Sequence, residues 1–404
     1  MEKSNEQMST IAIHGTKSPH ALHAHLAPIY ATSTYTFDSA EQGIRRFSGE
    51  EPGYTYSRFG NPTTAEAAEI IAALETFGIV DDKGLPLEAK ALLHASGQSA
   101  MATMFLSNLT AGDTVLSCRA IYGGTFEFLH NFLQGFGVKV LFDDMNDKEA
   151  VKKIVESNPS VKLIHLETPA NPTMRCVDIE AMCSIARQHN IKVSIDNTFA
   201  TPYLQQPFKY GVDFIFHSTT KFLNGHGTSI GGVLIGKDAA FMNGKAHQTC
   251  KLLGGNSNPF DAYLLMLGIK TLALRMEKHC DNAETVAHFL NNHPAIANVY
   301  YNGLPDHPDF EISSRQMRRH GAVLSFEIKG GFEKAKQFIN RLGLCLRAVS
   351  LGTVDTLISH PASMSHSGMS KEERIAGGIT DGLIRMSVGL EFIDDILKDL
   401  DQAL

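Results

Sequence analysis

Seven short apolar runs, each separated from the next by a stretch of helical character, set the strongest limit on how this chain folds. They occupy residues 91–96, 114–118, 138–144, 161–167, 191–197, 212–218 and 231–236. Runs of this length that are rich in β-branched and aromatic residues are typical of strands. Strands that alternate with helices form a mostly parallel sheet with helices on both faces. The pattern therefore predicts an α/β fold around a mostly parallel seven-stranded sheet.

The segments on either side of the sheet region have a different character. With 404 residues the chain exceeds one ordinary domain. Residues 1–61 are rich in turn formers and aromatics without a sustained period, so we expect an arm that lies on another surface. We expect the large domain over 62–267 and a smaller C-terminal α+β domain over 268–404. In the latter, an amphipathic helical pattern is followed by strand-like segments at 323–330 and 383–390.

Charge, hydropathy and cysteine spacing exclude several classes of protein. The 36 basic and 43 acidic residues give a net charge of -7, and neither sign forms a long block, so we expect no nucleic-acid partner. No apolar run approaches the roughly 18 residues that a membrane span needs, and the first residues lack the apolar stretch of a secretory signal. We therefore expect no membrane association and a cytoplasmic location. The six cysteines form no C-x-x-C pair, which indicates free thiols.

Small and chemically active residues follow the ends of the predicted strands. In an open parallel sheet, ligands bind beyond the carboxyl ends of the strands, so these residues are expected to share one edge. They are Gly97 and Gln98 after the first run, Tyr122 after the second, Glu167 and Asn171 after the fourth, Asp196 after the fifth, and Ser218, Thr220 and Lys221 after the sixth.

This edge contains the parts that a pyridoxal 5'-phosphate site requires. A helix that begins at Gly97 offers free N–H groups to a phosphate. Tyr122 can stack on a pyridine ring, Asp196 can keep its nitrogen protonated, and Lys221 can bind the aldehyde covalently. Taken alone, a strand-end Asp is usually a turn or cap residue, and a lone Lys is usually a solvated charge. Because independent caps would not gather at one edge, the set favours a cofactor site.

The segment STTKFLNGHGTSIGG, from Ser218 to Gly232, resembles the Cys/Met-metabolism (trans-sulfuration) family of pyridoxal-phosphate enzymes. That family includes cystathionine γ-lyase, methionine γ-lyase, cystathionine γ-synthase and the homoserine-ester sulfhydrylases. Further similar segments are YTYSRFGNPT, ETPANPT, DNTFATP, RMEKHCDNA, HPASMSHS and DGLIRMSVGLE, and together they span nearly the whole chain. The resemblance implies the type I fold of pyridoxal-phosphate-dependent transferases.

The resemblance also implies a role for each candidate residue. Lys221 would bind the cofactor covalently, Asp196 would pair with the pyridinium nitrogen, and Tyr122 would stack on the ring and protonate the leaving group. Four residues would hold the phosphate within the subunit: Gly97, Gln98, Ser218 and Thr220. The substrate carboxylate would be bound by three others: Arg385, Ser350 and Asn171.

The arm has a part in this resemblance as well. Tyr56 and Arg58 would reach the cofactor phosphate of the neighbouring subunit, so residues 1–61 are expected to contact that subunit. The active unit would then be at least a dimer, and the family is usually tetrameric.

Members of this family catalyse either elimination or replacement at the γ-carbon, and the same motifs serve both reactions. Our leading hypothesis is γ-elimination on cystathionine, methionine or homocysteine, which yields 2-oxobutyrate, ammonia and a thiol. The alternative is γ-replacement on O-acetyl- or O-succinylhomoserine; β-elimination is a third. Gly124 stands where methionine γ-lyases typically have Cys, which argues against a dedicated methionine lyase. Asp355 replaces the Glu of the SLGxxE motif, one methylene shorter.

The sequence gives less support to three other functions: a metal site, a phosphate-binding loop and a non-enzymatic role. His20, His23 and His25 lack Cys or carboxylate partners at ligand spacing, so we expect no metal site. The segment GGVLIGKD fits G-x-x-x-x-G-K but lacks the Ser or Thr of a phosphate-binding loop. A non-enzymatic cofactor-binding role would be expected to have lost Lys221, which is present.

Overall fold

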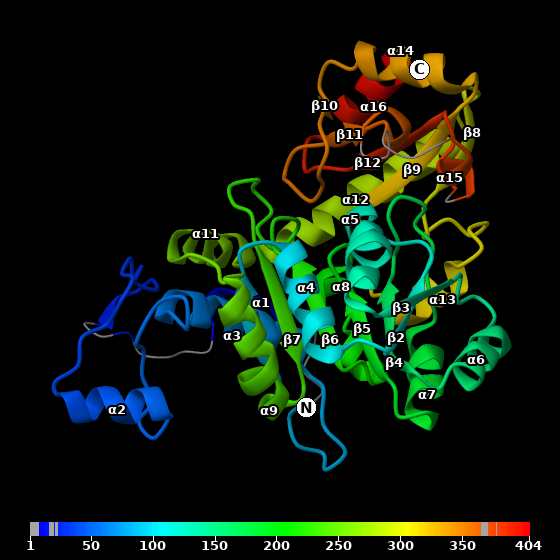
Figure 1. The fold of residues 1–404 in the computed structure, drawn as a ribbon. Helices are drawn as coiled ribbons and strands as arrows, with labels where there is room; N and C mark the ends of the chain where they lie inside the picture. Colours follow the sequence, from blue (N-terminus) through cyan, green and yellow to red (C-terminus); the bar gives the residue numbers. More distant parts are fainter. Residues whose placement is uncertain (1–7, 16–19, 21–22, 365–370, 377) are drawn as a thin grey trace.

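A seven-stranded sheet forms the centre of the chain (Figure 1). The structure is a computed structural model that describes residues 8–15, 20, 23–364, 371–376 and 378–404. The last three residues of the segment HPASMSHS thus lie outside the described residues. The strands of the sheet are β1 Lys90–His94, β2 Thr114–Cys118, β3 Lys139–Asp143, β4 Val161–Glu167, β5 Lys192–Asp196, β6 Phe214–Ser218 and β7 Gly232–Gly236.

The strand order is β1-β7-β6-β5-β4-β2-β3, and β7 alone in this sheet runs antiparallel to its neighbours. All seven predicted strands are confirmed, with ends shifted by no more than two residues. Because the other strands run in one direction, their carboxyl ends share an edge. Glu167 and Asp196 pair directly at that edge, as the last residues of β4 and β5.

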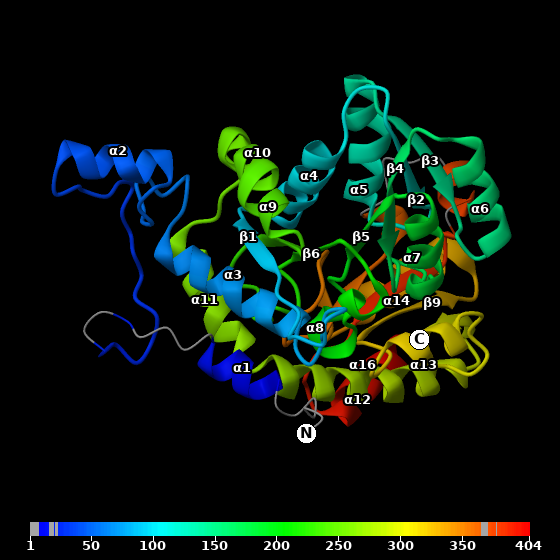
Figure 2. The same ribbon diagram turned by 90° about the horizontal axis from the view of Figure 1, so that it is seen from below.

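Helices pack on both sides of the sheet. Figure 2 shows α4 and α10 on one side of the strands and α8 and α12 on the other. Helix α3 (Pro62–Glu75) follows the arm: the Asn61 side chain caps it, Pro62 occupies its first turn, and its buried side chains join the core. The helices around the sheet are α3 Pro62–Glu75, α4 Gly97–Asn108, α5 Gly123–Glu127, α6 Lys148–Ser157, α7 Ile179–Gln188, α8 Thr201–Leu204, α9 Ala239–Phe241, α10 His247–Leu253 and α11 Pro259–Ile269.

The C-terminal part of the chain forms a smaller, five-stranded sheet in the order β10-β11-β12-β9-β8. Two of its strands were predicted, and three were not. β10 and β11 have only two and three residues, and β8 has five residues of which only the first is buried. Its strands are β8 Ile296–Tyr300, β9 Val323–Ile328, β10 Leu346–Arg347, β11 Leu357–Ser359 and β12 Leu383–Ser387. Its helices are α12 Leu272–Asn291, α13 Phe310–Gln316, α14 Gly331–Arg341, α15 Lys371–Ala376 and α16 Ile393–Ala403.

The N-terminal arm contains two helices that the sequence pattern did not reveal. Helix α1 (Met8–His14) buries Met8 and packs on α3, so it belongs to the body of the chain. Helix α2 (Ala40–Ser48) stands away from the body (Figures 1 and 2). Ser39 caps its start and Gly49 ends it with a left-handed backbone.

No helix in the described ranges has the length and apolar character needed to cross a membrane.

Candidate active site

The start of α4 forms a phosphate-sized cradle beside the end of β6. The Ser96 side chain caps α4 by accepting the Ser99 N–H at 3.1 Å, and the other first-turn N–H groups lie at the helix end. A Cβ on Gly97 would lie 2.7 Å from the Cβ of Ser218, so only glycine lets these two segments meet. Gln98 is exposed and donates to the carbonyl of Gly124 at 3.0 Å.

Lys221 lies just after β6, in the turn that Ser218 begins. Its Nζ donates to the hydroxyl of Ser350 at 2.7 Å. Burial, and secondly the charge of Arg385, lowers the pKa of Lys221 to about 8. A neutral amine is the nucleophilic form, so Lys221 is prepared for covalent attachment at near-neutral pH. Ser350 has a φ of 99°, a strained value that is characteristic of functional sites.

Arg385 reaches the same place from β12 of the C-terminal sheet. Its side chain donates to the Asn171 side-chain oxygen at 3.1 Å and to the Ser350 carbonyl at 2.7 Å. Burial lowers its pKa to about 10, which still leaves it charged at neutral pH. A buried guanidinium with no carboxylate among these partners is suited to bind one from a ligand.

Asp196 ends β5 and is held by a residue that the sequence analysis did not single out. Thr198 donates its N–H to Asp196 at 2.9 Å, and its hydroxyl accepts the N–H of Ser218 at 2.9 Å. The spacing of two residues after a strand-end Asp was the signal that could have revealed it. Burial raises the pKa of Asp196. A cationic partner such as a pyridinium nitrogen would restore its charge.

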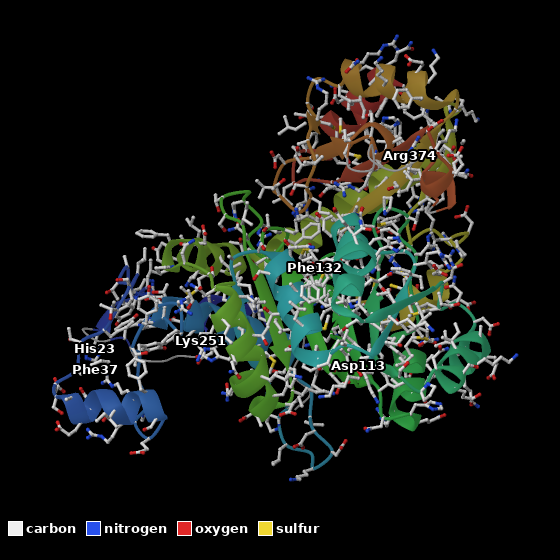
Figure 3. All side chains as sticks on the ribbon, in the orientation of Figure 1. His23, Phe37, Asp113, Phe132, Lys251 and Arg374 are labelled. Carbon is white, nitrogen blue, oxygen red and sulfur yellow. The ribbon has the colours of Figure 1, made fainter. Side chains whose placement is uncertain are left out.

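Tyr122 begins α5 and is half-exposed, with its ring close to Gly124. A Cβ on Gly124 would lie 2.6 Å from Cε1 of this ring. Helix α5 continues as a π-helix over Phe128–Phe132, a feature that often accompanies functional sites. A cavity of about 360 Å³ opens here; Figure 3 labels Phe132, one of its lining residues, which are Gln98, Gly124, Glu127, Phe128, Asn131 and Phe132.

The structure gathers most of the predicted residues but not the two from the arm. Thr220 lies in the turn after β6, where its hydroxyl accepts the N–H of Gly231 at 3.0 Å. Tyr56 and Arg58 are exposed, and Arg58 donates to the carbonyl of Lys251 at 2.7 Å. Within the described ranges, neither residue hydrogen-bonds to the strand-end residues. The roles assigned to all these side chains stay predictions.

The residues at this edge fit pyridoxal phosphate. The glycine-lined helix start suits the phosphate, and Lys221 has a lowered pKa. Asp196 is half-buried, and no ion pair joins it to a Lys, Arg or His in the part of the chain that the structure describes. Among the described residues, no group of three His, Cys, Asp or Glu side chains could hold a metal ion. The Nε2 atom of His20 lies 3.7 Å from Oε1 of Glu66. Fold and site together define a pyridoxal-phosphate-dependent enzyme of fold type I.

Comparisons with known proteins identify the family. A profile of the Cys/Met metabolism PLP-dependent enzymes matches residues 9–404, and the chain belongs to this family. It is 46% identical to an L-methionine gamma-lyase of Fusobacterium nucleatum subsp. nucleatum, over 100% of this chain and 99% of the relative. An O-acetyl-L-homoserine sulfhydrylase of Leptospira meyeri is 37% identical, over 99% and 97%. The crystal structure of cystathionine gamma-lyase from Lactobacillus plantarum complexed with L-serine matches with a TM-score of 0.89 and 38% identity, over 98% of both chains.

These relatives bear on the argument from Gly124. That residue was taken to weaken assignment as a methionine lyase, yet relatives named L-methionine gamma-lyase reach 46% identity. One position on the substrate side of a pocket is a weaker guide than similarity over the whole chain. The chain is a pyridoxal-phosphate-dependent enzyme of the Cys/Met metabolism family, and the relatives at 46% identity are carbon-sulfur lyases by name.

Proposed function

We propose that this enzyme catalyses γ-elimination on a sulfur amino acid, with methionine, homocysteine and cystathionine as the candidate substrates. The products are 2-oxobutyrate, ammonia and a thiol. The proposal rests on the hydrogen bonds that join Lys221 to Ser350 and Ser350 to Arg385. The Lys221 amine has a lowered pKa, and the buried Arg385 guanidinium near it has no carboxylate among its hydrogen-bond partners in the described residues. The lyase names of the relatives at 46% identity support the same reaction.

Arg385 binds and orients the substrate. Its guanidinium fork can form two parallel hydrogen bonds to the α-carboxylate, and Asn171 and Ser350 hold the fork in place. Because the Arg385 side chain is buried, water competes weakly for the bound carboxylate. The orientation presents the Cα–H bond of the substrate to Lys221.

Lys221 and Tyr122 move the protons. When bound, pyridoxal phosphate withdraws electrons from the substrate Cα and so makes its proton removable. The Lys221 amine takes that proton, because its lowered pKa makes it an effective base near neutral pH. Once Lys221 has given up the Cα proton, its amine would take a second proton from Cβ; the electron pair of that C–H bond forms the Cβ–Cγ double bond as the Cγ–S bond breaks. The leaving thiolate would take its proton from the Tyr122 hydroxyl. Asp196 would pair with the cofactor nitrogen and favour its protonated form.

The same proposal includes a homo-oligomer, at least a dimer and, as is usual in the family, a tetramer, in the cytoplasm. Ile44 and Phe47 on α2 are 68% and 66% exposed, which favours a covering partner. Among the described residues, no hydrogen bond, ion pair or ring contact joins Tyr56 or Arg58 to the strand-end residues; Arg58 instead donates to the Lys251 carbonyl. A second copy that receives them at its phosphate cradle would supply the missing donors.

Product analysis tests the reaction. Purified, cofactor-loaded protein is given L-methionine or L-cystathionine alone, and 2-oxobutyrate and thiol release are measured. In parallel, O-acetylhomoserine is supplied with sulfide or cysteine, and thiol consumption is scored. Rapid 2-oxobutyrate release without an added thiol supports elimination. Thiol capture with little 2-oxobutyrate would instead establish γ-replacement, the alternative that the sulfhydrylase relative represents.

A further inference from the structure

Glu167, a carboxylate at the end of β4, takes no part in the chemistry described above. It is 3% exposed and pairs with Asp196 in the register of the sheet. Its two oxygens accept from two different backbone segments. One accepts the N–H of Tyr122 at 2.7 Å, and the other accepts the N–H of Asn171 at 3.0 Å. A single side chain therefore joins the start of α5 to the loop after β4.

Both hydrogen bonds connect Glu167 to residues of the candidate active site. Tyr122 is the N-cap residue of α5, and its side chain makes no capping hydrogen bond. The Glu167 carboxylate accepts its backbone N–H and so holds the backbone from which the tyrosine ring projects. On the other side, Asn171 accepts from Arg385 through its side chain at 3.1 Å. Glu167 is thus hydrogen-bonded directly to Tyr122, the ring-stacking residue. It is connected through Asn171 to Arg385, the residue proposed to bind substrate.

We propose that Glu167 is a positioning residue, which sets the location of Tyr122 over the cofactor and of the Asn171–Arg385 pair at the substrate carboxylate. The inference rests on the proposed function, since it assigns Glu167 to the same site. Glu167 acts through its neighbours and not on the reacting atoms.

The charge state of Glu167 sharpens the test. Burial, and secondly the charge of Asp196, raises the pKa of Glu167 to about 8, against the opposing effect of its two N–H donors. Glu167→Gln removes the ionisable group but keeps the size and shape of the side chain. It keeps one acceptor oxygen and turns an NH₂ group toward a backbone N–H donor, so one of the two hydrogen bonds at Tyr122 and Asn171 is lost.

A control with the same chemistry lies at the opposite end of the sheet. Asp213 precedes β6 and accepts the N–H of Val193 at 2.8 Å, at the amino end of β5. Asp213→Asn makes the same carboxylate-to-amide change at a backbone N–H bond. It therefore reports the general cost of such a change to the fold, without altering the edge that carries Lys221.

The experiment measures the two variants and the wild type in cofactor-loaded form. The readouts are the visible absorption of the lysine-bound cofactor, its dissociation constant, and kcat and KM for L-methionine and L-cystathionine. We expect Glu167→Gln to lower kcat/KM by about 100-fold, because small misplacements of reacting groups have effects of that size. KM should rise because Arg385 is displaced, and kcat should fall because Tyr122 is displaced. The visible absorption of the lysine-bound cofactor should also change. Asp213→Asn should leave all readouts near wild type.

The proposal is overturned if soluble Glu167→Gln keeps the wild-type absorption and both kinetic constants within about twofold. An equal loss in Asp213→Asn would also overturn it, because the effect would then be general destabilisation. If Glu167→Gln is insoluble, Glu167→Asp is measured instead; it keeps two acceptor oxygens on a shorter side chain, and the same outcomes decide. Absorption and cofactor affinity need no turnover. A wild type that binds cofactor but eliminates nothing would therefore refute the proposed function and leave the Glu167 comparison intact.

Discussion

The strand-end cluster around Lys221 and the arm around α2 differ in almost every physical respect. In the cluster, Lys221, Ser350 and Arg385 are linked by hydrogen bonds of 2.7 Å, and Arg385 is buried. On the arm, Ile44 and Phe47 are exposed, and Phe37 lies far from the body at the left of Figure 3. The cluster is linked within one chain, whereas the arm has apolar side chains on α2 that nothing in its own chain covers fully.

This difference separates what one chain can supply from what an assembly must supply. Burial in the cluster shifts the pKa values of Lys221 and Arg385, so its chemistry is built into the monomer fold. The arm has contacts of its own, such as the ion pairs of Arg45 and Arg46 with Glu51, which hold α2 together but do not attach it to the body. Substitutions in the two regions should therefore fail in different ways.

The largest effect is expected at the centre of the cluster. Lys221→Ala removes both the amine that binds the cofactor and the base that takes the Cα proton, so turnover should fall to background. The visible absorption of the lysine-bound cofactor should disappear, while circular dichroism shows an unchanged fold. Turnover that survives this substitution would falsify the assignment of Lys221.

Arg385→Lys should have the next largest effect. Lysine keeps the charge but cannot form the two parallel bonds, and its shorter reach leaves Asn171 or Ser350 without a donor. We expect kcat/KM to fall by about 100-fold or more, since breaking a buried charged contact costs roughly 3 kcal/mol. Steady-state kinetics should place most of the loss in KM, with cofactor absorption unchanged. A loss confined to kcat would argue against carboxylate binding by Arg385.

Arg58→Ala tests whether the arm serves a second copy. Loss of a charge-assisted contact to phosphate should weaken cofactor binding by about 10- to 100-fold, measured by titration of the cofactor-free protein. Mixed oligomers give a sharper test. Co-assembly of Arg58→Ala chains with Lys221→Ala chains should restore activity, because one site then has an intact lysine from one copy and an intact arginine from the other. No recovery in mixtures that exchange subunits would contradict a role across the interface.

The two regions also differ in how well the sequence predicted them. The central sheet was predictable because buried strands are continuous apolar runs and their ends must share an edge. This placed Asp196 and Lys221 at one site before any coordinates. The β10 strand and helix α2 were missed, because they are two and nine residues long and depend on local caps or edge pairing. The function of Glu167 was missed because its side chain accepts from backbone N–H groups, which carry no sequence signal. Thr198 was missed although its position two residues after a strand-end Asp was a usable signal.

The smallest effect is expected at Gly124, where the cluster meets the open cavity. A Cβ here would lie 2.6 Å from Cε1 of Tyr122 and 3.1 Å from Oε1 of Gln98, so any side chain must displace the ring. Gly124→Ala and Gly124→Cys should therefore lower kcat/KM for L-methionine by a similar factor, about 10-fold, which corresponds to the usual 1–3 kcal/mol for one altered pocket contact. The ratio of kcat/KM for L-methionine and L-cystathionine should be the same in both variants, because the added Cβ is common to them. A gain in methionine selectivity with Cys but not with Ala would show that the thiol itself, and not the displaced ring, determines the choice of substrate.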